Sequence, residues 1–316
     1  MKNVEVRLAV HGGGVASIAL PVRIALRVRL AWMWWSAFFT FGVSLGCAAS
    51  PQASVDLALE VVGTSTSEVV LRDGARMQLD RAELAFGPLT LCPGAQAGSL
   101  CETARLEWLD AARVDALSAE PRVVGSLVGA TGSVRSFMYD LGVASLLGEP
   151  GSRWLSDAAR GLGPASLWIS GRVEQQGRTL PFSARILVQS EEDNEQGVPV
   201  VRKSSTDRFS FEITEQTRAL RITFDPAAWV TALRGSDFVQ DEPCSLPQTR
   251  VCQGSWELSC GASGKEAARQ DCAASGQVCS PSVGCAPEVE ISKASSAYRT
   301  IANALTAGER PTFELR

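Results

Sequence analysis

Six cysteines lie within 42 residues near the C-terminal end of the chain, from Cys244 to Cys285. The stretch holds few large apolar side chains, so a conventional hydrophobic core is not expected there and crosslinks must replace it. A zinc site is disfavoured because the stretch contains no C-x-x-C pair and no histidine. We therefore expect a small disulfide-held module, although six cysteines allow many pairings and the sequence does not choose among them.

The N-terminal segment has the plan of a bacterial secretory signal. An apolar run, Leu30–Leu45, follows Arg23, Arg27 and Arg29, and small residues follow the run. A positive region, an apolar region and a small-residue exit direct the following chain across the inner membrane. The run is shorter than the roughly 20 residues of a stable membrane span. We favour a signal peptide over residues 1–46, with a retained single-span anchor and a buried helix as alternatives.

The beginning of this segment is long for a signal, so we also consider translation from a later position such as Val22. At its end, Ser44-Leu45-Gly46-Cys47 resembles the lipobox of bacterial lipoproteins. Gly46-Cys47 fits that pattern, whereas Ser44 and Leu45 depart from it. The resemblance implies a lipid on Cys47, and Ala48 in place of aspartate implies sorting to the outer membrane. Ordinary cleavage after Ala48 or Ala49 is the alternative.

Setting Cys47 aside leaves an even number of cysteines, which in an exported chain predicts four disulfides. They are Cys92, Cys101, Cys244, Cys252, Cys260, Cys272, Cys279 and Cys285. We interpret the first two as the staple of a hairpin tip, because redox pairs usually stand two residues apart. The stretch 244–285 resembles small extracellular cysteine-rich modules of bacterial surface proteins.

Residues 55–240 show the period-two alternation of half-buried strands, as in Val55–Val61. Asp73-Gly74 is a tight-turn signal between two apolar runs, and residues 167–188 suggest a second hairpin. Helix signals are short and lie near residues 154–160, 225–233 and 295–305. We predict a mainly β fold, an antiparallel sandwich or barrel with a small disulfide-rich insertion and two or three short helices. A single strand is expected over Glu83–Leu91.

The predicted organisation has a linker at 47–54, a β-sandwich at 55–240, the cysteine-rich module at 244–285, and a helix with a final strand at 290–316. The apolar pattern returns at Thr312–Leu315, so the module is expected to be an insertion into the β-domain. Deleting residues 244–285 should then leave a foldable body, whereas trimming residues 311–316 should destabilise it.

The histidine content excludes several kinds of chemistry. His11 is the only histidine, and it lies within the predicted signal. Ser-His-Asp and Cys-His catalysis are therefore excluded for the mature chain, which also lacks the commonest metal ligand. The chain has a formal net charge of −4, and removing a signal with five basic residues and one acidic residue leaves about −8. Such an acidic body is not expected to bind nucleic acid.

Three further features of the sequence are candidate sites. Glu191, Glu192, Asp193 and Glu195 form an acidic run that could hold calcium, although we favour a solvated loop. The glycine-rich stretch 125–132 matches neither a G-x-S-x-G elbow nor a phosphate loop and is interpreted as a strand with a turn. Among the tryptophans outside the signal, Trp256 is the one expected to face a partner, and the others are expected in or beside the core.

These features favour a non-enzymatic lipoprotein of the cell envelope or surface with a binding or structural role and no cofactor. Its expected partners are the membrane, through an N-terminal lipid or a residual anchor, and an unknown protein or glycan. The outer membrane is the favoured location, with a periplasmic or secreted soluble form as the alternative. Two other functions stay open: a secreted carboxylate-dependent hydrolase and a calcium-modulated adhesion module.

Overall fold

The computed structural model describes residues 52–94, 101, 103–145, 153–175, 177–188, 200–204, 210–239, 244–280, 283–308 and 310–316. Contacts divide the chain into Met1–Ala49 and Ser50–Arg316, and the account below concerns the second unit. The predicted signal and Cys47 lie outside the described residues. Within the described part of the chain, no helix is long and apolar enough to cross a bilayer.

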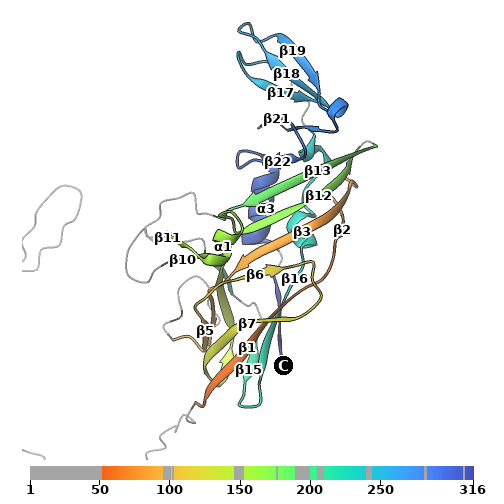
Figure 1. The fold of residues 1–316 in the computed structure, drawn as a ribbon. Helices are drawn as coiled ribbons and strands as arrows, with labels where there is room; N and C mark the ends of the chain where they lie inside the picture. The colour runs from red at the N-terminus through yellow and green to blue at the C-terminus, as the bar shows by residue number, and fades with distance from the viewer. Residues whose placement is uncertain are drawn as a thin grey trace, which may run out of the picture. The chain divides into compact units, whose positions relative to one another are not determined.

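Two curled sheets in a sandwich-like arrangement form the body of the protein, which confirms the mainly β prediction (Figure 1). The larger sheet consists, in spatial order, of β14 (Val200–Ser204), β9 (Ser136–Asp140), β4 (Leu89–Cys92), β5 (Leu106–Trp108), β7 (Arg122–Ala130), β1 (Ser54–Gly63), β16 (Ala219–Phe224) and β23 (Thr312–Leu315). The smaller sheet consists of β2 (Glu68–Val70), β3 (Arg76–Phe86), β12 (Leu167–Gln175), β13 (Arg178–Ile186) and β22 (Val289–Ile291), with β6 (Ala112–Asp115) paired to β3.

The remaining elements are short. In the body they are β8 (Gly132–Val134), β10 (Val143–Ser145), β11 (Arg153–Leu155), α1 (Asp157–Gly161), β15 (Phe211–Ile213), α2 (Ala227–Val230), the 3-10 helix η1 (Gly235–Phe238) and α3 (Ser296–Ala307). In the cysteine-rich stretch they are β17 (Arg250–Gln253), β18 (Trp256–Cys260), β19 (Glu266–Asp271), the 3-10 helix η2 (Ala273–Ser275), β20 (Val278–Ser280) and β21 (Gly284–Ala286).

Local patterns produced the hairpins and the first strand as predicted. Leu57, Leu59 and Val61 of β1 are buried on one face of the strand, as period-two alternation requires. β2 and β3 pair across Asp73-Gly74, where Gly74 adopts a positive φ of 85°. β12 and β13 pair along their full length. Each of these pairings joins segments that are adjacent in the sequence.

Two strand pairings are parallel, which the sequence patterns did not predict. β1 pairs in parallel with β16, so that Ala58 lies opposite Ala219, and β13 pairs in parallel with β22. On the β1–β16 pair, the Glu60 carboxylate accepts hydrogen bonds from the Arg221 guanidinium at 2.7 and 2.9 Å. The remaining pairs among the described strands of the two sheets are antiparallel.

The single strand expected over Glu83–Leu91 is wrong, because this segment changes sheets. β3 ends at Phe86 in the smaller sheet, and β4 begins at Leu89 in the larger one. The two residues between them are joined by a cis Gly87-Pro88 peptide. Proline has no N–H to offer a strand ladder, and a Cβ on Gly87 would lie 2.4 Å from the Asp110 carbonyl oxygen. The pairing therefore stops here and resumes in the other sheet.

Aromatic side chains fill the interior between the sheets. The Phe86 ring contacts Trp108, Tyr139 and Phe224, with ring centroids 5.0 to 6.2 Å apart. The Phe313 ring of the edge strand β23 lies 4.4 Å from that of Phe137 on β9, although β9 belongs to the other half of the larger sheet. The larger sheet therefore curls far enough to bring its two ends together.

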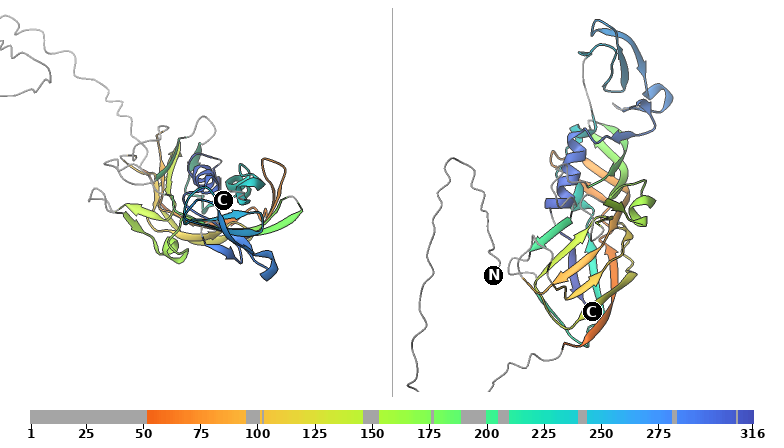
Figure 2. Two further views of the ribbon diagram at one scale, coloured as in Figure 1. Left: turned by 90° about the horizontal axis from the view of Figure 1, so that it is seen from above. Right: turned by 90° about the vertical axis from the view of Figure 1, so that its left-hand side faces the viewer.

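Helices α2 and α3 pack beside the sheets (Figure 2). The sequence predicted Ser295 or Ser296 as the cap of α3, and Ser295 is the cap, its hydroxyl accepting from the Tyr298 N–H at 3.1 Å. The helix expected over residues 225–233 is shorter, because α2 ends at Val230. The chain turns there, burying Leu233, whose carbonyl accepts from the Arg72 N–H at 2.9 Å.

The cysteine-rich stretch forms a three-stranded sheet, β17-β18-β19, and a hairpin, β20–β21. Its disulfides are Cys244–Cys260, Cys252–Cys279 and Cys272–Cys285, and Cys92–Cys101 joins the ends of the β4–β5 loop. The prediction of four disulfides is thereby confirmed. After this stretch the chain returns to both sheets through β22 and β23. Whether residues 244–285 can be deleted without unfolding the body stays a prediction.

Candidate functional site

Several residues proposed from the sequence cannot contribute to a site in the described structure. Cys47 and the acidic run at 191–195 lie outside the described residues, so lipidation and calcium binding stay predictions. The glycine-rich stretch forms β7, as predicted, and its glycines allow close packing. A Cβ on Gly125 would lie 2.4 Å from the Trp108 Nε1, and one on Gly129 would lie 2.0 Å from the Arg105 carbonyl oxygen.

Glu257 is a buried carboxylate inside the cysteine-rich module. It accepts a hydrogen bond from the Cys285 N–H at 2.9 Å, and the Arg250 guanidinium lies 3.3 Å away. Its oxygens also lie close to the sulfurs of Cys272 and Cys285, but these sulfurs form a disulfide and are not available as thiolate ligands. We therefore assign Glu257 to the packing of β18 against β21.

Trp256 lies in the module with 38% of its surface accessible, and its contact with a partner stays a prediction. The Arg269 guanidinium lies 5.7 Å from its ring, and Arg269 also binds Glu266 at 2.6 Å. This hydrogen bond is the main reason why the pKa of Glu266 is lowered. Trp108 and Trp229 are buried and Trp168 is partly buried, as predicted.

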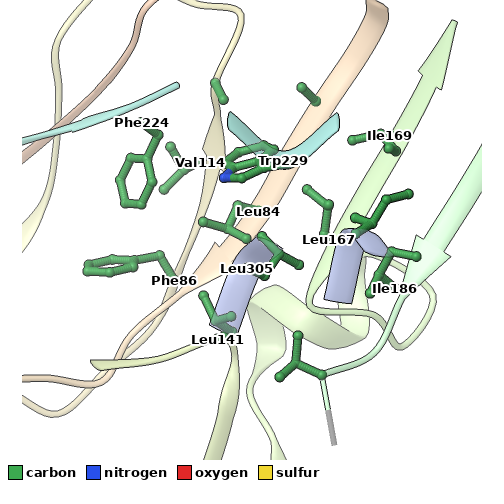
Figure 3. Close-up of a cluster of buried hydrophobic side chains, with 14 of the residues drawn as sticks. Leu84, Phe86, Val114, Leu141, Leu167, Ile169, Ile186, Phe224, Trp229 and Leu305 are labelled. Carbon is green, nitrogen blue, oxygen red and sulfur yellow. The ribbon is translucent and has the colours of Figure 1, made fainter. Parts of the chain in front are cut away.

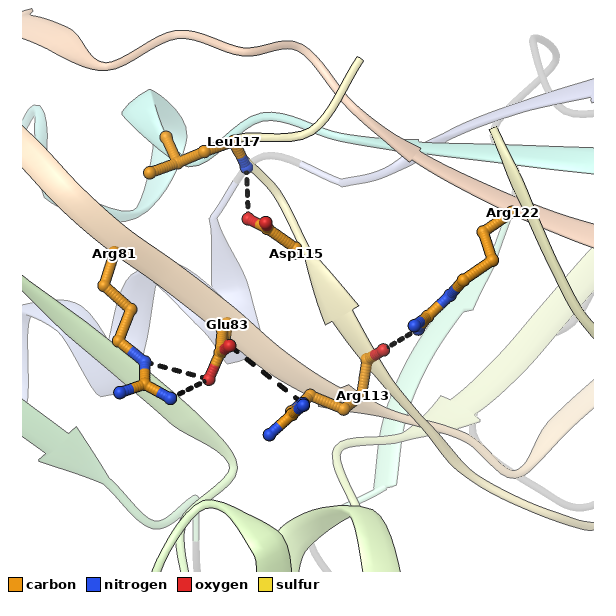
Figure 4. Close-up of polar contacts among 6 residues, drawn as sticks. All are labelled: Arg81, Glu83, Arg113, Asp115, Leu117 and Arg122. Atoms are coloured by element: carbon orange, nitrogen blue, oxygen red, sulfur yellow. Dashed lines mark hydrogen bonds and ion pairs between the residues drawn. The ribbon is translucent and has the colours of Figure 1, made fainter. Parts of the chain in front are cut away.

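The outer face of the smaller sheet carries a network of paired charges (Figure 4). Glu83 binds Arg81 at 2.5 Å and lies 4.0 Å from Arg113. The Trp168 ring lies against the guanidinium groups of Arg81 and Arg185, 3.4 and 4.1 Å from the ring centroid. Opposite charges are interleaved across this face, so it presents no single-sign surface to a partner. Its contacts are those of a solvated sheet surface.

A groove of about 700 Å³ runs along the other end of the same sheet. Its lining side chains include Glu68, Arg76, Arg172 and Glu174, and Arg172 also binds Asp80 at 3.1 Å. The groove combines both charges with exposed apolar groups such as Val70. Nothing in this lining selects one class of ligand.

The best-formed candidate is a cavity of about 190 Å³ beside the central aromatic cluster. Its walls come from segments far apart in the sequence, and its apolar lining is Leu84, Leu141, Phe224, Ala228, Trp229, Leu305 and Pro311. Figure 3 shows five of these side chains, Leu84, Leu141, Phe224, Trp229 and Leu305, converging between the strands and the helices. We refer to it as the Tyr139 cavity.

Polar groups line another part of the Tyr139 cavity. Tyr139 is only 4% exposed and lines this part of the cavity. Burial raises the pKa of Tyr139, and the nearby Arg310 guanidinium offsets only part of that rise. Arg310 itself is exposed and also lines the cavity. A neutral hydroxyl and a guanidinium therefore stand together as hydrogen-bond donors.

Asp225 is the carboxylate of this lining. Its Oδ1 accepts from the Thr64 hydroxyl at 3.0 Å and from the Ala227 N–H at 3.1 Å. Paired-carboxylate hydrolysis needs two carboxyl groups that face the same space, and the described lining supplies one. Donors beside an apolar wall can instead bind a ligand without reacting with it. Of these three polar residues, the sequence marked only Asp225, and only as the start of a helix. Tyr139 and Arg310 could not be predicted as site residues, because tertiary packing brings them to the cavity.

Comparisons with known proteins do not assign this chain to a family. No protein-family model matches it, and no curated protein matches it. Among solved structures, the chain is similar to MbnP from Methylosinus trichosporium, with a TM-score of 0.29 and 13% sequence identity, over 58% of this chain and 79% of that one. A similarity this low assigns neither a fold family nor a function to this chain.

Proposed function

We propose that the protein is a non-enzymatic lipoprotein of the bacterial cell envelope, tethered through Cys47, whose β-sandwich has a binding role. The observation that carries the proposal is the use of the cysteines. Eight of the nine form four disulfides, which leaves Cys47 without a cysteine of this chain to pair with. Disulfides are typical of oxidising compartments outside the cytoplasm. Cys47 also stands where the lipobox-like sequence would place the acylated N-terminus.

The binding role is supported by the Tyr139 cavity. It combines an apolar wall with hydrogen-bond donors, as small-molecule sites do. Its described lining contains one carboxylate, Asp225, and no histidine, so it lacks the pair of carboxylates that the hydrolase alternative requires. We propose the outer membrane as its location, because Ala48 and not aspartate follows Cys47, as in the lipoproteins that this signal resembles.

Intact mass measurement of the protein from membrane and soluble fractions tests the tether. We expect a membrane-associated species that begins at Cys47, carries a lipid and has the mass deficit of four disulfides. The matched variant Cys47→Ala should lose the lipid and leave the membrane fraction while keeping all four disulfides. An unacylated protein that begins at Ala49 or Ser50 would contradict the proposal.

A further inference from the structure

We propose that the Glu257 carboxylate protects the Cys272–Cys285 disulfide from reduction by thiols, most strongly by thiols that carry a negative charge. The inference gives a chemical role to a side chain that also packs β18 against β21. It concerns the cysteine-rich module and depends neither on the lipid tether nor on the Tyr139 cavity.

The Glu257 carboxylate is held directly beside the disulfide. One of its oxygens and the sulfurs of Cys272 and Cys285 all lie within 4.8 Å of one another, and its Oε2 accepts from the Cys285 N–H at 2.9 Å. Gly284 permits this approach, because a Cβ at that position would lie 2.4 Å from the same oxygen. Glu257 is only 9% exposed, so water and salt screen its charge less than they screen a charge at the surface.

The sulfur that a thiol from solution can reach belongs to Cys285. Cys272 is fully buried, whereas Cys285 is partly exposed. A thiolate therefore forms its new bond to the Cys285 sulfur, and the S–S bond breaks with its electron pair on Cys272, which leaves as a thiolate. A second thiolate then attacks the mixed disulfide and releases Cys285. Two small thiols are oxidised to one disulfide, and the two cysteines are reduced and take up the two protons.

Both partners in the first step carry negative charge close to Glu257. The attacking thiolate brings a charge to Cys285, and a second charge develops on Cys272 as it leaves. Each is repelled by the carboxylate, which raises the barrier to reduction. The Arg250 guanidinium, 3.3 Å from the carboxylate, opposes this repulsion, but its side chain is 67% exposed. Water therefore screens the Arg250 charge more strongly, and repulsion is the net effect.

Reduction by small thiols of different charge tests the proposal in the full-length protein with its disulfides formed. Cysteamine is cationic, 2-mercaptoethanol is neutral and 2-mercaptoethanesulfonate is anionic, and the three are close in size. Each is used at the same thiolate concentration, and the cysteines released over time are alkylated and located by peptide mass spectrometry. The measured quantity is the ratio of the rates with cysteamine and with 2-mercaptoethanesulfonate at Cys272–Cys285. We expect Glu257→Gln to lower this ratio by about threefold or more, as one charge acting over several ångströms predicts.

The rate ratio separates the charge of Glu257 from its contribution to packing. Any weakening of the module by Glu257→Gln speeds reduction by every thiol through a common factor, and this factor cancels in the ratio. Arg250→Gln should raise the ratio, because the carboxylate loses its counter-charge. Glu266→Gln, the same charge change at an exposed glutamate paired with Arg269, is the matched control and should change the ratio by less than about twofold. The ratio at Cys92–Cys101, in the body, should stay as in the parent in all three variants.

A common acceleration by Glu257→Gln with all three thiols would overturn the inference and leave Glu257 with a packing role alone. Rates that Glu257→Gln leaves unchanged would overturn it too, and so would an equal change of the ratio in Glu266→Gln. None of these results depends on whether Cys47 is acylated, which the intact mass measures separately. Failure of the tether and failure of the protective carboxylate can therefore be told apart.

Discussion

The β-sandwich body and the cysteine-rich module of this chain reach a folded state by different means. In the body, a continuous cluster of buried apolar side chains extends from β1 to α3. In the module, the buried cluster consists of Cys252, Cys272 and Cys279 with Cys285 packed against it. The difference teaches that burial stabilises the first region, whereas covalent loop closure must stabilise the second. Substitutions in the two regions should therefore differ in how much folding free energy they remove and in how much of the structure they loosen.

The largest effect is expected from Phe86→Ala in the body. The Phe86 ring is fully buried and contacts three other aromatic rings, so its removal leaves a cavity that the surroundings cannot fill. We expect the free energy of unfolding of the body to fall by about 3 to 5 kcal/mol, measured by denaturant titration with tryptophan fluorescence. Phe313→Ala, on the partly buried edge strand β23, is the control and should lower the free energy of unfolding by a smaller amount. A loss for Phe86→Ala no larger than that of the control would count against a core held by burial.

The second effect is expected from Cys252→Ser with Cys279→Ser in the module. This disulfide joins residues 27 apart in the sequence, and loop-closure entropy assigns it about 3.5 kcal/mol. The loss should appear as faster hydrogen exchange in β17, β18 and β19, with little change in the body. The matched pair Cys92→Ser with Cys101→Ser opens a separation of 9 residues and should cost about 1 kcal/mol less. The reverse order would show that strain or packing, and not loop length, determines what these bonds contribute.

A smaller effect is expected from Glu257→Gln. The substitution keeps the size of a buried side chain but removes the charge that Arg250 and the Cys285 N–H bind. We expect a destabilisation of the module of about 1 to 2 kcal/mol, measured by hydrogen exchange at the Cys285 amide. Glu266→Gln, which breaks an exposed ion pair of β19, should have almost no effect. Equal effects of the two substitutions would show that the module gains nothing from its buried carboxylate.

The smallest effect concerns Asp73 at the turn between β2 and β3. The Gly235 N–H donates to its carboxylate at 2.9 and 3.1 Å, which is the main cause of a pKa lowered from 3.8. A lowered folded pKa contributes stability above the unfolded pKa, and this contribution is lost as the pH falls through the folded pKa. Asp73→Asn should therefore flatten the decline of the melting temperature between about pH 5 and pH 2. Superimposable pH profiles of the two proteins would contradict this.

The sequence predicted those parts of the fold that depend on neighbouring residues. Asp73-Gly74 marks a turn because glycine tolerates a positive φ, and a serine at 295 or 296 marks the start of α3 because a serine hydroxyl can bind a free N–H at a helix start. The number of disulfides followed from parity alone. The pairing within the module did not, because it depends on how β17, β18 and β21 pack.

The parts that could not be predicted depend on contacts between distant segments. The parallel pairing of β1 with β16 leaves no mark on either strand, since both alternate as an antiparallel strand would. The change of sheet at Gly87-Pro88 interrupts an apolar run that suggests one strand. The Tyr139 cavity is assembled from β9, α2 and the segment after α3, and none of its members is unusual within its own stretch of sequence.

The parallel pairing of β1 with β16 also determines the order in which the body can be completed. Ala58 and Ala219 are opposite each other in the finished sheet, yet a chain synthesised from its N-terminus presents Ala219 last of the two. Until then β1 can pair with β7 only, and its other edge remains open to foreign strands. Closing a loop of this length is slow compared with forming the hairpins. This edge of β1 is therefore the part of the larger sheet where a mispairing during folding would do most harm.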